Sequence, residues 1–158
     1  MKYNKDKRTK NLSLRDIHVG DWVQVWSDTT ERYSPPLKII QICDDGTIYL
    51  VTSDEERPTP WEENIKNVDA LLVTKELLKG FGFDLEQKCC VTHTYYVLYN
   101  TKRICEFTEC EYFSTITTGG LSCKFYPYFH EFIDNMSRLF PELLILQWKG
   151  IEKINYKK

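Results

Sequence analysis

Residues 127–140, PYFHEFIDNMSRLF, decide the fold, because they form the clearest amphipathic helix in the sequence. Apolar residues recur there at steps of three and four, which places them in one broad stripe along a helix. Polar residues, among them His130, Glu131 and Asp134, take the other side. The stripe consists of Tyr128, Phe129, Phe132, Ile133, Met136, Leu139 and Phe140. A stripe of this width needs an apolar surface to cover.

The segments before this helix supply such a surface. Four stretches rich in β-branched and aromatic residues follow one another, separated by short turns, which is typical of an antiparallel meander. They are residues 90–99, 103–109, 112–118 and 121–126. We therefore predict an antiparallel sheet plus the helix 127–140 within residues 83–158. The apolar run at residues 143–148 predicts one further strand.

The N-terminal half has a different pattern. Residues 14–73 contain several short β-rich stretches joined by turns, and we predict a small β unit of the SH3-like barrel or meander type. Asp45-Gly46 between two such stretches is a hairpin signal, because this pair tolerates positive φ. Residues 74–82 predict a linking helix with Thr74 as its N-cap. The predicted fold class is therefore α+β.

The net charge of −2 conceals an uneven distribution. Residues 1–15 carry six Lys or Arg and one Asp, a net charge of +5, and residues 149–158 carry four Lys and one Glu, a net charge of +3. The residues between them therefore carry −10. We expect residues 1–13 to form a flexible basic arm, because short charged termini are usually frayed.

The composition also indicates a compartment. No apolar run approaches the roughly 20 residues that a membrane-spanning helix needs. The N-terminus lacks the apolar segment of a secretory signal. We expect a cytoplasmic protein that makes no membrane contact. In that compartment the six cysteines are expected to be reduced and to pack as small apolar side chains.

The candidate chemical groups lack the partners that catalysis or metal binding needs. His130-Glu131 begins a metalloprotease-like pattern, but Asp134 stands where the second histidine belongs. His93 lies near Cys89 and Cys90, but no third group is placed to orient the imidazole. We expect no catalytic residue, no cofactor and no metal site.

Aromatic residues are the strongest positive signal. A helix covers only one face of a sheet, so about half of the rings on the predicted strands would face away from it, and an exposed patch of this kind marks a partner surface. The candidate interaction surface consists of Tyr95, Tyr99, Tyr112, Trp22 and Trp26.

Four phrases occur in an order that resembles a group of small uncharacterised proteins of Bacteroidetes bacteria and their phages or mobile elements. They are IHVGDWVQV (17–25), DDGTIYLV (44–51), LLVTKELLKGFGF (71–83) and YFHEFIDNMSRLF (128–140). Members of that group have a GDWV strand, an LT-x-E-x-L segment that ends in GF, and a C-terminal helix of the HE type. This chain lacks the proline before the Leu-Thr pair and has HEFIDNM where Gln-Asn is usual. The resemblance implies a two-part architecture and a mobile-element origin, and it implies no catalytic residues.

These observations predict a non-catalytic protein-interaction module of a phage or mobile element, which binds a partner protein or a second copy of itself. The alternative is a nucleic-acid-binding accessory protein that uses the basic arm and the small barrel. Salt separates the two hypotheses, because binding to DNA or RNA weakens steeply as the salt concentration rises.

Overall fold

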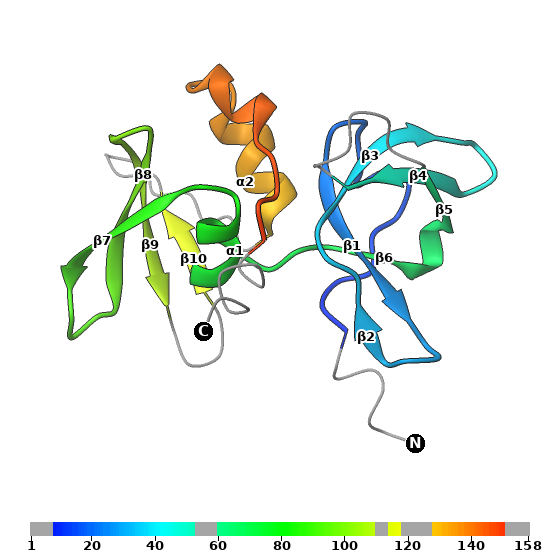
Figure 1. Cartoon of the computed structure of the whole chain (residues 1–158), viewed down its shortest axis with the longest axis horizontal. Coiled ribbons are helices and arrows are strands. Elements are labelled where there is room, and N and C mark those ends of the chain that lie inside the picture. Colours follow the sequence, from blue (N-terminus) through cyan, green and yellow to red (C-terminus); the bar gives the residue numbers. More distant parts are fainter. Residues whose placement is uncertain (1–7, 53–59, 110–113, 118–127, 151–158) are drawn as a thin grey trace. The chain divides into compact units, whose positions relative to one another are not determined.

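The computed structural model of the chain describes residues 8–52, 60–109, 114–117 and 128–150. The chain divides into two compact units, Met1–Leu71 and Leu72–Lys158, and each contains its own β-sheet (Figure 1). The predicted strand at 121–126, the first residues of the predicted strand at 112–118, and Pro127 at the start of the predicted helix lie outside the described residues.

The N-terminal unit contains an antiparallel sheet that curls, as the small β unit predicted at residues 14–73 requires. Its strand order is β2-β1-β3-β4-β5, and β6 pairs with β1. The strands are β1 (Trp22–Ser27), β2 (Arg32–Tyr33), β3 (Leu37–Ile42), β4 (Thr47–Val51), β5 (Trp61–Asn64) and β6 (Val68–Asp69), and the 3-10 helix η2 (Ile65–Asn67) joins β5 to β6.

Strand β1 is the centre of this unit. Its first residues pair with β3, its middle residues with β6 and its last residues with β2. Trp22, Val23, Val25 and Trp26 are all buried, so both faces of the strand are covered. This explains why apolar side chains occupy neighbouring positions in β1 instead of alternating with polar ones.

The hairpin between β3 and β4 forms where the Asp-Gly pair predicts it. Gly46 has a φ of +92°, a conformation that L side chains rarely adopt. The Asp45 carboxylate accepts a hydrogen bond of 2.9 Å from the backbone N–H of Thr47, and this interaction lowers the pKa of the carboxyl group. The turn is therefore stabilised by local interactions that the sequence itself encodes.

The prediction of a flexible arm is wrong for residues 8–13. Asn11 forms a β-bridge with Asp69, and the backbone N–H of Leu12 donates to the Val68 carbonyl at 3.0 Å. Leu12 itself is 2% exposed. This segment pairs with β6 because that strand offers backbone groups that are otherwise unpaired, and charge alone does not prevent such pairing.

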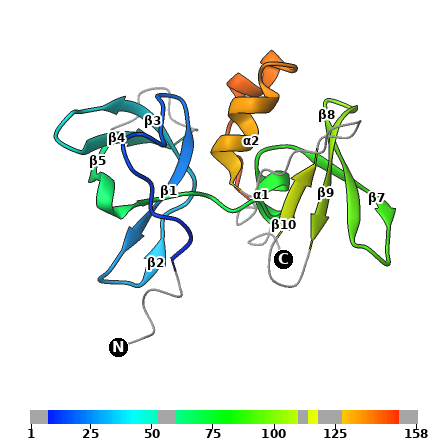
Figure 2. The ribbon, with the colours of Figure 1, turned by 180° about the vertical axis from the view of Figure 1, so that it is seen from behind.

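The C-terminal unit contains a four-stranded antiparallel sheet in the order β10-β9-β8-β7 (Figures 1 and 2). The strands are β7 (Asp84–Cys89), β8 (Thr94–Tyr99), β9 (Lys102–Glu109) and β10 (Ser114–Thr117). The predicted meander is confirmed for β8, β9 and β10. Asn100 and Thr101, both with positive φ, make the two-residue turn between β8 and β9.

Strand β7 was not predicted, and residues 90–93, which were predicted as the start of a strand, form a turn instead. The sequence of β7, DLEQKC, is mostly polar because the strand lies at the edge of the described sheet and exposes most of its side chains. An edge strand of this kind gives no apolar signal.

Helix α1 (Lys75–Gly80) begins where its N-cap predicts, with the Thr74 hydroxyl accepting a hydrogen bond of 3.1 Å from the Leu77 backbone N–H. It does more than link two halves. The Lys75 ammonium lies 4.8 Å from the Tyr95 ring centroid and donates to the Tyr95 hydroxyl at 3.2 Å. Helix α1 therefore contacts the sheet directly, and the expectation that a single helix covers it is corrected.

Helix α2 (Phe129–Met136) is the predicted amphipathic helix, although shorter than 127–140. Phe129 stacks on Phe81 at a ring-centroid distance of 4.4 Å, and Phe132 lies 6.1 Å from Phe83. Phe83 in turn lies 5.5 Å from Tyr99 of β8. The apolar stripe thus joins the sheet through an aromatic cluster, which we define as Phe81, Phe83, Phe129 and Phe132.

Two assignments within this helical segment are corrected. His130, expected on the polar side, is 3% exposed, whereas Leu139, expected in the stripe, is 70% exposed. The reason for the second difference is that the α-helix ends at Met136, so Leu139 no longer follows the helical period.

The predicted strand at 143–148 is also wrong, because Pro141–Ile145 form a 3-10 helix, η3, with the proline in its first turn. Leu143 is buried while Leu144 and Ile145 are exposed. Beyond it, the Trp148 ring lies so close to Gly80 that a Cβ on that glycine would stand 2.1 Å from a ring carbon. Glycine is therefore required at the end of α1.

Among the described residues, no helix is both long and apolar enough to span a membrane.

Replacing Phe132 with alanine tests the role of the aromatic cluster. The ring is fully buried, so Phe132→Ala should lower the free energy of unfolding of the C-terminal unit by about 3–5 kcal/mol. Urea denaturation followed by far-UV circular dichroism measures the change. Leu139→Ala, at an exposed position of the same segment, should change stability by less than about 0.5 kcal/mol. Equal losses in the two variants would contradict the assigned packing.

Candidate functional site

The described residues of the N-terminal unit enclose a hollow of about 480 Å³, which we call the aromatic hollow. Its walls are residues 25–30 and 32–34 on one side and Trp61, Glu63 and Asn67 on the other. The first side is the hairpin from β1 to β2 with the residues next to it, and the second comes from β5 and η2. Segments about 30 residues apart in sequence therefore face the same space.

Two interactions of Trp26 hold the hairpin side of the aromatic hollow: a ring contact and a hydrogen bond. Trp26 and Tyr33 are paired across β1 and β2, and their ring centroids lie 4.9 Å apart in an edge-to-face arrangement. The Trp26 indole N–H donates to the Asp28 carboxylate at 2.8 Å. Trp26 is only 4% exposed, and its hydrogen bond orients Asp28, which also lines the hollow.

The opposite side presents an exposed ring beside a carboxylate. Trp61 and Glu63 are two residues apart on β5, so they point to the same face of the strand. Trp61 is 43% exposed, and the Glu63 carboxylate accepts a hydrogen bond of 3.2 Å from the Asn67 side-chain amide. A large indole that remains this exposed is available to a ligand.

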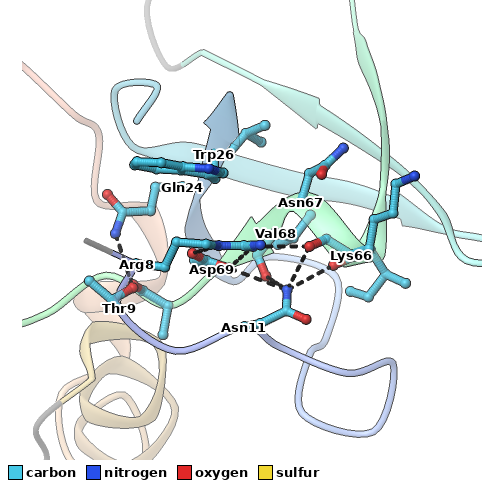
Figure 3. A network of polar contacts seen from close by, with 12 residues as sticks. Arg8, Thr9, Asn11, Gln24, Trp26, Lys66, Asn67, Val68 and Asp69 are labelled. Carbon is cyan, nitrogen blue, oxygen red and sulfur yellow. Dashed lines mark hydrogen bonds and ion pairs between the residues drawn. The ribbon is translucent and has the colours of Figure 1, made fainter. Parts of the chain in front are cut away.

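A buried carboxylate supports the hollow from within the unit (Figure 3). The Asp69 side chain is fully buried, and Arg8 donates to both of its oxygens. Asn11 donates to one oxygen at 3.2 Å, and the Tyr33 hydroxyl donates to the other at 2.6 Å. The backbone N–H of Thr9 donates to the same hydroxyl at 2.7 Å. This network holds Tyr33, one wall of the aromatic hollow, in a single position.

The network raises the pKa of two of its members, Tyr33 and Arg8. Burial raises the pKa of Tyr33, and its hydrogen bond to the Asp69 carboxylate raises it further. The hydrogen bond to Asp69 also raises the pKa of Arg8. The network therefore consists of a guanidinium, a neutral phenol and a carboxylate.

The residues predicted as an interaction surface belong to two units: Trp22 and Trp26 to the N-terminal one, and Tyr95 and Tyr99 to the C-terminal one. Trp22 and Trp26 are 3% and 4% exposed because both faces of β1 are covered, so neither presents an exposed indole, although Trp26 lines the aromatic hollow. Tyr95 and Tyr99 are half-buried, and their neighbours are Lys75 and Phe83 on the side of α1. Tyr112 lies outside the described residues.

On the opposite face of the C-terminal sheet, the described residues form no open aromatic patch. Tyr96 lies there, but the Arg103 guanidinium stands 3.9 Å from its ring centroid and the Lys88 ammonium 5.5 Å from it. These cations are themselves paired with Glu86 and Glu106. Charges on this face therefore neutralise one another, and the Tyr96 ring is already occupied by a cation.

Cysteine and histidine residues are the candidates for a nucleophile pair or for metal ligands. Hydrogen bonds from the Thr92 hydroxyl and from the backbone N–H groups of Thr92 and Val91 lower the pKa of Cys89, and His93 takes no part in this. Burial strongly raises the pKa of Cys105. Within either unit taken alone, the described residues bring no three metal-ligating side chains together.

Of the residues that line the hollow, sequence reasoning named only Trp26, and it missed the two other aromatic residues, Trp61 and Tyr33. Trp61 lies between prolines and glutamates in a stretch that reads as a charged loop, and Tyr33 belongs to a strand of only two residues. An isolated tryptophan in a charged segment was the one available signal. Comparison of the chain with protein-family models, curated proteins and solved structures finds no match.

Replacing Arg8 tests whether the network stabilises the N-terminal unit. Among the described residues, Arg8→Ala leaves the buried Asp69 carboxylate with Asn11 and Tyr33 as its side-chain donors, and stability should fall by about 3 kcal/mol, the lower end for breaking a buried ion pair. Urea denaturation followed by tryptophan emission measures this. Arg15→Ala, an exposed arginine in the following segment, should have almost no effect. Adding Asp69→Asn to Arg8→Ala should recover part of the loss.

The Tyr33 pKa predicts a dependence on alkaline pH. Because its folded-state pKa is raised, the folded chain keeps the phenol proton after the unfolded chain has released it. The resulting stability is fully present below the ordinary pKa of about 10 and is lost as the pH rises from there through the folded pKa. Urea denaturation across alkaline pH should therefore show a steeper loss for the wild type than for Tyr33→Phe. Parallel curves would contradict the assigned hydrogen bond.

Proposed function

We propose that the protein is a non-catalytic protein-interaction module of a phage or mobile element, and that its N-terminal part, a small SH3-like β unit, carries the binding surface. One observation supports this above the others: a concave surface carries an exposed indole, Trp61, and is also lined by Trp26 and Tyr33, whose rings pack edge to face. Tryptophan and tyrosine in such a pocket are the residues that supply most of the binding energy at protein interfaces.

The geometry favours an extended segment of a partner as the ligand. The hollow is open along the margin of a curled sheet, and its walls come from a hairpin and a neighbouring strand. A concave surface of this volume accepts one or two side chains. The rest of the segment would then run along the exposed residues of the β1–β2 hairpin.

The nucleic-acid hypothesis has less support from the described residues. Arg8, a cation of the supposed arm, is used by Asp69, and Tyr96, the aromatic residue on the open sheet face, is covered by Arg103. Its test is the salt dependence of any binding to DNA or RNA.

A peptide-display library tests the proposal. Peptides enriched on the wild-type chain should bind it saturably in fluorescence anisotropy. Trp61→Ala should weaken their binding about tenfold or more, because truncating a central aromatic side chain at an interface costs about 2 kcal/mol or more. Val91→Ala, which removes an apolar side chain that is 83% exposed in the other unit, should leave the affinity unchanged. Failure to enrich any peptide whose binding depends on Trp61 would refute the proposal.

A further inference from the structure

The aromatic hollow combines ring faces with negative charge. Trp61 exposes its indole, and Tyr33 and Trp26 line the same hollow. Among aromatic side chains, the face of the tryptophan indole attracts cations most strongly. An aromatic surface alone would also accept apolar side chains. The charge around it therefore decides whether a cationic or an apolar side chain is preferred.

Two carboxylates line the hollow, and both are held in place by a hydrogen bond. Asp28 accepts from the Trp26 indole on the hairpin side, and Glu63 accepts from Asn67 on the side of β5. Each of these bonds uses one carboxylate oxygen and leaves capacity for a further donor. A side chain that enters between Trp61 and the hairpin therefore meets carboxylates from both walls.

The charge of the surrounding unit has the same sign. Residues 1–71 contain thirteen Asp or Glu and ten Lys or Arg, a net charge of −3 with histidine neutral. A field of this sign raises the local concentration of cationic ligands and speeds their association. It disfavours acidic segments to the same degree.

One lining residue opposes this charge. Arg32 is exposed on β2 and is the only cation among the described residues that line the hollow. An arriving cation would be repelled by the Arg32 guanidinium. Removing the Arg32 charge should therefore strengthen binding of a cation, whereas removing a carboxylate should weaken it.

Building on the proposed function, we infer that the aromatic hollow binds a lysine or arginine side chain of an extended basic segment in a partner protein. The cation lies over Trp61 and between Asp28 and Glu63, and the apolar stem of the side chain packs against the rings. Recognition is then electrostatic at long range and cation–π in the hollow.

Three synthetic peptides test the inference: a glycine–lysine repeat, a glycine–glutamine repeat and a glycine–glutamate repeat. The chemical shift of the Trp61 indole N–H, followed by NMR on the full chain, reports occupation of the hollow. The lysine peptide alone should shift it, and its affinity should fall as the salt concentration rises. The other two peptides should leave this resonance in place.

Variants separate the hollow from general attraction to an acidic protein. Trp61→Ala and Glu63→Gln should each weaken binding of the lysine peptide about fivefold to thirtyfold, measured by fluorescence anisotropy because Trp61→Ala removes the indole resonance. Glu86→Gln removes the same charge from the other unit and should change the affinity by less than about twofold, as expected for an exposed, screened charge. Arg32→Gln should strengthen binding. The amide spectra of all variants establish that they fold.

The outcomes distinguish this inference from the proposed function. If the glutamine or glutamate peptide shifts the Trp61 resonance as much as the lysine peptide does, the hollow binds segments without regard to charge; the inference fails and the proposed function stands. Equal losses in Glu63→Gln and Glu86→Gln would also overturn the inference. Self-association that Glu63→Gln abolishes would assign the hollow to a basic end of a second copy instead of a separate partner. If no peptide, including those from the display library, depends on Trp61, both fail.

Discussion

Asp69 places a carboxylate with no exposed surface inside the N-terminal unit, and the arrangement of that unit follows from the need to compensate it. A buried charge is tolerated only when it is paired and fully hydrogen-bonded. The donors come from three places in the chain: Arg8 and Asn11 before β1, and Tyr33 in β2. The Asp69 side chain on β6 therefore joins the segment before β1 to strand β2. The hydrogen bonds that offset the cost of burying the Asp69 carboxylate also determine where these segments lie.

The aromatic hollow depends on this network through Tyr33. The hydroxyl of Tyr33 belongs to the buried network, whereas its ring packs edge to face on Trp26 and forms a wall of the hollow. A binding surface that shares a residue with a buried network is rigid before a ligand arrives, which reduces the entropy lost on binding. The C-terminal unit shows the opposite situation. Its open sheet face satisfies its own charges through Lys88, Arg103 and their carboxylate partners, so it offers a ligand little that is not already used.

Local signals in the sequence predicted most of the secondary structure correctly. The helical period marked α2, Thr74 marked the start of α1, and Asp45-Gly46 marked the hairpin between β3 and β4. In each case the structure is stabilised by residues within a few positions of one another. The wrong predictions concern segments whose structure depends on contacts with other strands. The segment at residues 8–12 is ordered by β6, about 55 to 60 positions away, and β7 is held by its pairing with β8 although its own side chains are mostly polar.

The sequence by itself therefore determined the class of fold and the aromatic surplus, because periodicity, caps and turns act over short distances along the chain. Tertiary structure alone decided which aromatic residues are exposed. Trp22, Trp26 and Trp61 all occur in the N-terminal unit, yet only Trp61 keeps a large exposed surface. The physical reason is that exposure depends on which segments pair and how a sheet curls. Those choices are made by contacts between residues far apart in the chain, above all by the donors that gather around Asp69.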